Sequence, residues 1–150
     1  IYPYISSLAI KSKEQTINFI KKVTILIGVL SFLISVLIFI FAGLILSILA
    51  GNQYDQSVLL IRIMAFLPFI IALSNIFGVQ TMLTFNYKQA FSRIIMIGSA
   101  INIILTLIMT PIYQAVGISV AMVITEIYIT LAMYLYLRGQ GINLLEIKRV

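Results

Sequence analysis

The stretch VTILIGVLSFLISVLIFIFAGLILSILA, residues 23–50, decides the fold class. It carries no charge and exceeds the roughly 20 residues that a helix needs to cross a hydrocarbon core of about 30 Å. Because backbone N–H and C=O groups find no water inside lipid, such a segment crosses as a helix with internal hydrogen bonds. The run therefore predicts a membrane-spanning helix that is tilted or protrudes from the bilayer.

The whole chain has the composition of a membrane protein. Hydrophobic residues make up 62% of its 150 residues and charged residues 9%, against roughly 45–50% and 25% in soluble domains. A chain of this length cannot bury so much apolar surface in its own core, so the remainder must contact lipid or other protein. The net charge of +6 would favour nucleic acid in a soluble protein. Here the basic residues flank apolar segments, and we expect no nucleic-acid partner.

Three further apolar segments predict an all-α integral membrane protein with four antiparallel transmembrane helices. The predicted spans cover residues 23–50, 63–83, 94–110 and 115–137. The links between them are short, which favours sequential antiparallel neighbours. We expect Pro111 to close the third span, and Arg138 with Gly139 to end the fourth. Pro68 frees a backbone carbonyl inside the second span and predicts a bend there, a candidate hinge.

Lys and Arg are distributed unequally between the two ends of these spans. One end is predicted to carry nine basic residues: Lys11, Lys13, Lys21, Lys22, Lys88, Arg93, Arg138, Lys148 and Arg149. The other end carries only Arg62. The positive-inside rule then predicts that both termini are cytoplasmic. The flanking segments 11–22 and 142–150 mix apolar and charged residues, and predict either helices lying on the inner leaflet or cytoplasmic extensions of neighbouring helices.

Each predicted span carries a stripe of small or polar residues at about 100° per residue. The third-span stripe contains Ser92, Ser99, Asn102, Thr106 and Thr110, and the fourth-span stripe contains Ser119, Glu126 and Thr130. The first-span stripe contains Thr24, Gly28, Ser31, Ser35 and Ala42, and the second-span stripe contains Ser74, Gly78 and Thr81 with Asn75 at its edge. Such stripes either pack helices closely together or line an aqueous cavity. We favour packing for the first span, which has no strongly polar group.

Glu126 is the residue that packing explains least. A carboxylate at the centre of a bilayer costs about 2.5–3.5 kcal/mol even on lenient insertion scales. Three interpretations remain open: Glu126 carries a proton in an apolar site, faces water, or pairs with a cation outside this chain. The candidate cavity residues are Glu126, Asn102, Asn75, Thr130 and Thr106.

Covalent chemistry has little support in the sequence. There is no cysteine or histidine and there are four acidic residues, so we expect neither a disulfide framework nor a metal centre. No nucleophile–base pair or glycine-rich phosphate loop stands out. We therefore predict that the protein is not an enzyme and uses no cofactor.

Three runs carry a resemblance to a known family: YPYISSL, RIMAFLPFIIALSNIFGVQTMLTFNYK and INIILTLIMTPIYQAVGISVAMVITE. Together with the long first span they resemble the O-antigen-type oligosaccharide flippases of bacterial polysaccharide biosynthesis. The wider superfamily also holds multidrug extruders and the lipid II flippase. The likeness covers about residues 2–138.

The resemblance implies a transporter of about twelve helices in two lobes around a central cavity. Residues 1–150 would be its last four helices, a fragment of the C-terminal lobe, with YPYISSL ending the helix before them. Such proteins move lipid-linked oligosaccharide, such as an O-antigen or capsule repeat unit, across the bacterial inner membrane. Glu126, Asn102 and Asn75 would by position meet sugar or pyrophosphate. The family's cavity cations have no counterpart in these spans.

Other functions remain open at this stage. The first is a cation-coupled multidrug extruder of the same superfamily, with Glu126 binding H+ or Na+. A second is a membrane scaffold subunit that transports nothing. A membrane-embedded polymerase or ligase would want clusters of Arg, His or Asp within the membrane or a large periplasmic loop. The expected partners are lipid-linked oligosaccharide, membrane lipids and a coupling cation.

Overall fold

The computed structural model describes residue 5, residues 12–50 and residues 55–144, and within these ranges its regular structure is helical. The elements are α2 (Lys13–Ala50), α3 (Asp55–Met64), α4 (Leu67–Asn75), η1 (Ile76–Met82) and α5 (Lys88–Gly139). The predicted end of an earlier helix at residues 2–8 lies mostly outside the described residues, as do Lys11, Lys148, Arg149 and most of the segment 142–150.

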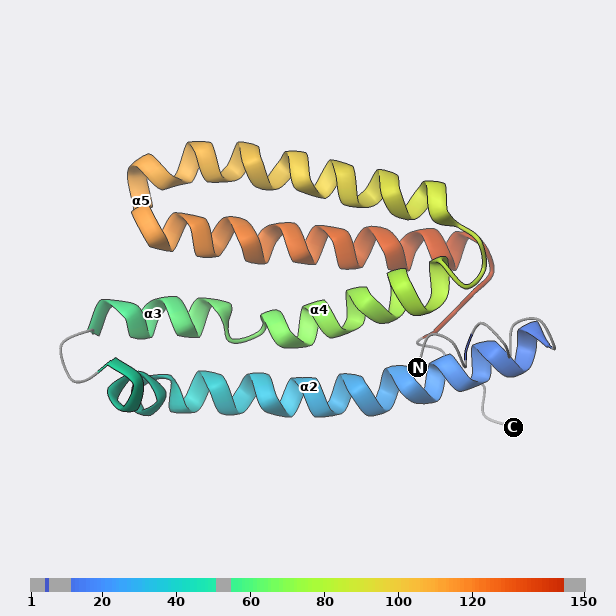
Figure 1. Ribbon diagram of the computed structural model, residues 1–150, viewed down its shortest axis with the longest axis horizontal. Helices are drawn as coiled ribbons and strands as arrows, with labels where there is room; N and C mark the ends of the chain where they lie inside the picture. The colour runs from blue at the N-terminus through green and yellow to red at the C-terminus, as the bar shows by residue number, and fades with distance from the viewer. Residues whose placement is uncertain (1–4, 6–11, 51–54, 145–150) are drawn as a thin grey trace.

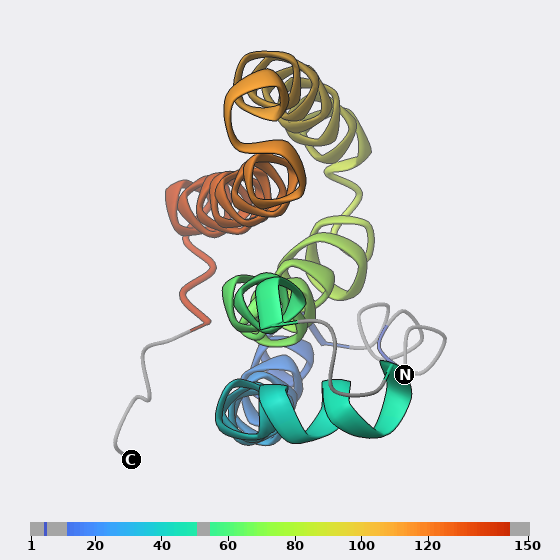
Figure 2. The ribbon, with the colours of Figure 1, turned by 90° about the vertical axis from the view of Figure 1, so that its left-hand side faces the viewer.

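The helices lie side by side, and α5 folds back on itself (Figure 1). Its first limb, residues 88–113, and its second limb, residues 115–139, run antiparallel on either side of Gln114, where φ is 51° and ψ is −129°. Figures 1 and 2 show the second limb between the first limb and α3–α4, with α2 on the far side of α3–α4. Three helical segments are long and apolar enough to cross a membrane: Lys13–Ile48, Ser57–Met82 and Lys88–Gly139.

Helix α2 begins ten residues before the predicted span, at Lys13. Lys, Glu and Gln are good helix formers, and the Ser12 hydroxyl accepts a hydrogen bond from the Gln15 amide at 3.4 Å, so the helix starts in the polar segment. For residues 13–22 the extension of a neighbouring helix is therefore confirmed. All members of the predicted first-span stripe are buried: Thr24, Gly28, Ser31, Ser35 and Ala42. The packing interpretation of that stripe is confirmed.

The middle helix is interrupted near Pro68, as predicted. Helix α3 ends at Met64, and α4 begins at Leu67 with Pro68 in its first turn. The ring of Phe66 in this break lies 6.2 Å from that of Phe32 and 6.0 Å from that of Phe39, both on α2. Aromatic contacts of this kind hold the break against α2.

Helix α4 continues into η1, a wider π-helical segment that the sequence did not predict. The Thr81 hydroxyl donates a hydrogen bond to the Ile76 carbonyl, five residues back, at 2.7 Å. Gly78 lies against the first and second limbs of α5, because a Cβ there would come within 2.7 Å of the Phe91 ring and 2.9 Å of the Met133 sulfur. The close approach at Gly78 holds the middle helix against both limbs.

The prediction that Pro111 closes the third span is wrong. Pro111 lies inside the first limb, whose helix begins at Lys88 and continues past the proline. A proline removes one backbone hydrogen bond and bends a helix, but here the chain reverses at the positive φ of Gln114. The reversal is tight, since a Cβ on Gly117 would lie 2.6 Å from the Met109 carbonyl oxygen.

Candidate functional site

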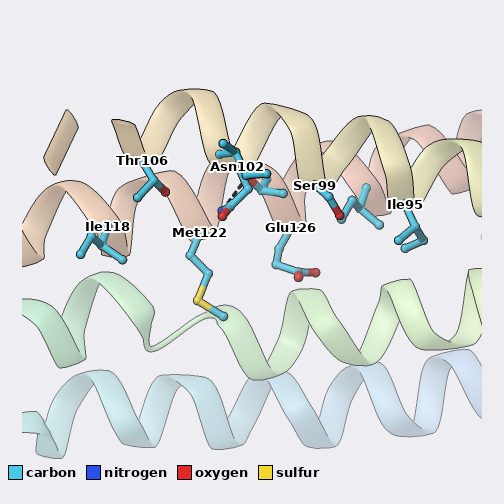
Figure 3. A pocket seen from close by; sticks show the side chains of 10 residues that line it. Ile95, Ser99, Asn102, Thr106, Ile118, Met122 and Glu126 are labelled. Atoms are coloured by element: carbon cyan, nitrogen blue, oxygen red, sulfur yellow. Dashed lines mark hydrogen bonds between the residues drawn. The ribbon is translucent and has the colours of Figure 1, made fainter. Parts of the chain in front are cut away.

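A pocket of about 480 Å³ lies along the two limbs of α5 (Figure 3). Its polar lining residues are Ser99, Asn102, Thr106, Thr125 and Glu126, and its apolar lining residues are Ile95, Ile103, Ile118, Met122 and Ile129. Figure 3 shows Ser99, Asn102 and Thr106 on the first limb and Met122 and Glu126 on the second. Both limbs therefore contribute polar groups to one space.

The two most polar residues of the pocket lie at mid-length of their limbs. At about 1.5 Å per residue, Glu126 lies roughly 16–20 Å from either end of the second limb. Asn102 lies roughly 16–21 Å from either end of the first limb by the same measure. Since a hydrocarbon core is about 30 Å thick, a limb that crosses a membrane would hold both groups near its centre.

Asn102 links the two limbs. Its side-chain amide donates a hydrogen bond to the Thr125 hydroxyl at 3.2 Å, and that hydroxyl donates to the Ala121 carbonyl at 2.8 Å. Thr125 is buried, and its hydroxyl accepts one hydrogen bond and donates another within the protein. The bond fixes the Asn102 amide nitrogen and leaves its carbonyl oxygen as an acceptor without a partner among the described residues.

Glu126 is half-buried, and its carboxylate makes no hydrogen bond or ion pair with any residue that the structure describes. Neither Arg62 nor Arg93 lines the pocket. The Glu126 carboxylate is thus an acceptor at mid-length of a membrane-type helix without an internal partner. A proton, a water-filled space or an external cation remain as the alternatives.

Thr130 and Asn75 are not brought to this pocket. Thr130 is 8% exposed, and its hydroxyl is within hydrogen-bonding distance of the Glu126 carbonyl at 2.8 Å and of the Ile70 carbonyl of α4 at 3.3 Å. Asn75 is exposed at the end of α4. Thr130 therefore joins the second limb to α4, while Ser99, Asn102, Thr106 and Glu126 share one pocket.

Sequence reasoning missed Thr125 and Met122 as pocket residues. Ile118, Met122, Thr125 and Ile129 recur at intervals of three or four residues along the second limb. That periodicity marks one helical face, but a mixed face of apolar residues and one threonine also fits ordinary packing. Only the position of the first limb, which lines the same pocket from the other side, shows that this face borders a pocket.

Gly98 of the first limb lies beside the pocket, at a close contact between the two limbs. A Cβ on Gly98 would lie 2.6 Å from Cγ1 and 2.8 Å from Cδ1 of Ile129. Small residues at such contacts let membrane helices approach closely. Gly98 therefore fixes the spacing between the limbs next to Ser99 and Asn102.

The polar groups that line the pocket are hydrogen-bond acceptors and hydroxyls, and the rest of the lining is apolar. A carboxylate, an amide carbonyl and the hydroxyls of Ser99 and Thr106 suit a ligand rich in hydroxyl donors or a cation. Among the described residues, no group of three His, Cys, Asp or Glu side chains could hold a metal ion.

The sequence of nearly the whole chain is similar to that of a curated protein. Over 139 residues, 93% of this chain, the sequence is 31% identical to a protein of Escherichia coli (strain K12) named "Putative O-antigen transporter". The chain is related to the O-antigen transporters. This match confirms the resemblance that the sequence indicated. The chain spans about a third of that protein, 34% of its length. No family model and no solved structure matches the chain.

Proposed function

We propose that this chain forms part of a membrane transporter that translocates lipid-linked oligosaccharide for polysaccharide biosynthesis, and that the α5 pocket lines its path. The observation that carries the proposal is the Glu126 carboxylate, unpaired among the described residues and facing the same pocket as Asn102. A saccharide headgroup cannot cross hydrocarbon unaided and needs hydrogen-bond partners along its route. The relationship to an O-antigen transporter supports the same substrate class.

The topology that we propose has four crossings, with the two limbs of α5 counted separately. The ends of the helices support an orientation with both termini cytoplasmic. Lys13, Lys88 and Arg138 lie at one end of the bundle, where α2 and the first limb start and the second limb ends (Figure 1). By the positive-inside rule this end faces the cytoplasm. The parent protein would have about twelve helices in the bacterial inner membrane, and this chain would supply part of its C-terminal lobe.

Transport by alternating access requires that helices move, and we propose that the break before Pro68 serves as a hinge. Hinges are a few residues at the ends of elements that absorb changes in φ and ψ. The break at residues 65–66 separates α3 from α4 beside the second limb. Motion there would change the space in front of Glu126.

The experiment that tests the function is complementation of a strain that lacks its own flippase. The full-length protein is compared with Glu126→Gln and with Glu126→Asp, at matched membrane abundance, with surface polysaccharide as the readout. We expect Glu126→Gln to lose polysaccharide and Glu126→Asp to retain part of it, because Asp keeps the charge. Normal polysaccharide with Glu126→Gln would remove the carboxylate from the transport cycle. A wild-type protein that restores drug efflux but no polysaccharide would favour the cation-coupled extruder instead.

A further inference from the structure

A second pocket, of about 510 Å³, lies at the end of the bundle where α2 begins. One wall comes from the first turns of α2 and the other from the turn that follows α5. The lining residues are Lys13, Glu14, Ile17, Asn18, Lys21, Gly141 and Asn143. This pocket is separate from the α5 pocket and shares no residue with it.

The turn after α5 is held firmly against the bundle. The Ile142 amide donates a hydrogen bond to the Leu137 carbonyl at 3.0 Å, and Gly141 has a φ of 74°, a conformation that glycine adopts without strain. The side chains of Ile142 and Leu144 are 1% and 2% exposed and belong to the apolar core at this end. The buried side chains of Ile142 and Leu144 therefore hold Asn143, which lies between them, in place opposite α2.

The lining chemistry fits a phosphate ester. Lys13 and Lys21 bring two ammonium groups, which bind phosphate as point charges, and Asn18 and Asn143 bring amide donors. Lys13 also lies over the Phe85 ring, 5.9 Å from its centre, which keeps its stem beside the bundle. The Glu14 carboxylate would repel a bare phosphate. It would accept a hydrogen bond from a headgroup that carries hydroxyl groups.

The depth of the pocket fits the headgroup layer of a bilayer. At about 1.5 Å per residue, Lys21 lies roughly 3 Å and Asn18 roughly 8 Å outside Val23, where the uncharged run begins. The polar layer on each side of the hydrocarbon is about 5–8 Å thick. Lys21 and Asn18 thus lie at headgroup depth, and Lys13 lies further toward water.

An exposed apolar strip continues from this pocket along α2. At about 100° per residue, Asn18, Lys21, Ile25 and Val29 share one face of the helix. Ile25 is 48% exposed and Val29 is 56% exposed. A ligand whose phosphate sat between Lys13 and Lys21 could therefore lay acyl chains on this strip, which a free phosphate ion could not do.

We propose that this pocket binds the phosphate headgroup of an anionic membrane glycerolipid, with its acyl chains on the exposed α2 face. Basic pockets between membrane helices are known to hold such headgroups. The site would anchor the first turns of α2 to one leaflet. The proposal does not depend on what the α5 pocket transports.

The test measures lipid binding to the purified full-length protein in phosphatidylcholine nanodiscs titrated with phosphatidylglycerol. We expect Asn18→Leu to lower the affinity for phosphatidylglycerol several-fold, because it removes a donor without changing charge. Gln15→Leu, on the same stretch of α2 but outside the pocket, should leave the affinity unchanged. Equal effects of the two variants would overturn the proposal, since general surface charge would then explain binding.

A charge-matched pair keeps the proposal testable if Asn18→Leu does not fold. Lys13→Gln with Lys21→Gln should weaken binding about 30-fold, from about 1 kcal/mol per lysine. Lys22→Gln with Lys88→Gln removes the same charge outside the pocket and should have a clearly smaller effect. Equal losses in the two pairs contradict a discrete site. Displacement of the lipid by millimolar inorganic phosphate would identify a free-phosphate site and overturn the lipid assignment.

Discussion

The contact between Gly98 and Ile129 sets the spacing of the two limbs, and Gly98→Ala tests it. The new methyl group would lie 2.6 Å from Cγ1 of Ile129, so the limbs must separate or Ile129 must move. Overpacking of this kind costs about 1–3 kcal/mol. Alanine also gains about 0.8–1.0 kcal/mol of helix propensity over glycine. The net expected loss of unfolding free energy is therefore about 0–2 kcal/mol, and a control is needed to separate the two contributions.

A matched control removes the propensity contribution. Gly43 also lies inside a helix, in α2, but no described atom lies within 4 Å of where its Cβ would be. Gly43→Ala gains the same propensity without overpacking, so the difference between the two variants isolates the contact. We expect Gly98→Ala to be about 1–3 kcal/mol less stable than Gly43→Ala. The assay is unfolding of the full-length protein in mixed detergent micelles.

A double substitution identifies the partner. Ile129→Ala removes both atoms that the new methyl group would meet, so Gly98→Ala should cost less in an Ile129→Ala background. We expect a coupling free energy of about 0.5–3 kcal/mol, the range for residues in contact. Equal stability of Gly98→Ala and Gly43→Ala, together with zero coupling to Ile129, would refute the packing of the two limbs described here.

Three further predictions follow from single contacts. Thr130→Val should destabilise the protein by about 0.6–1.7 kcal/mol relative to Thr24→Val in the same unfolding assay. The reason is that the Thr130 hydroxyl reaches the Ile70 carbonyl of another helix, whereas the Thr24 hydroxyl bonds only within α2. Equal effects of the two variants would rule out the bond between helices. Asn102→Leu should lower transport, measured by complementation, more than tenfold, while its loss of unfolding free energy stays in the same small range as that of Thr130→Val. Full transport by Asn102→Leu would place the amide outside the path. Pro68→Ala should slow transport at equal abundance if the break is a hinge, and an unchanged rate would make the proline purely architectural.

Hydropathy was enough to predict helices that can cross a membrane, because lipid leaves the backbone few alternatives. It was less reliable for where helices end. Residues 13–22 mix charged and apolar residues yet are helical, since a helix does not stop where the hydrocarbon stops. Pro111 looked like a terminator, but the chain reverses three residues later at Gln114. The π-helical segment Ile76–Met82 has no sequence signal comparable to apolar periodicity.

The candidate site was predicted in part, for a related reason. The angular spacing of Ser99, Asn102 and Thr106 follows from the sequence, as does their position on one helical face. The same arithmetic put Thr130 beside Glu126, and both do lie on neighbouring parts of the second limb. Only the structure shows that α4 lies against Thr130, so that its hydroxyl is used for packing. Which neighbour covers each face depends on contacts distant in sequence.

The central claim is that the α5 pocket lines the path of a saccharide headgroup, which requires water at mid-membrane depth, and cysteine labelling tests that requirement most directly. The chain contains no cysteine, so its positions can be probed singly in a full-length protein free of other reactive thiols. A charged thiol reagent reacts with the thiolate, which forms in water. Ser99→Cys lines the pocket, whereas Ile104→Cys, about 7.5 Å further along the same limb, lies outside it and is 57% exposed in this chain. We expect labelling of Ser99→Cys and protection of Ile104→Cys in intact membranes. Protection of Ser99→Cys, with or without labelling of Ile104→Cys, would contradict an aqueous path through this pocket.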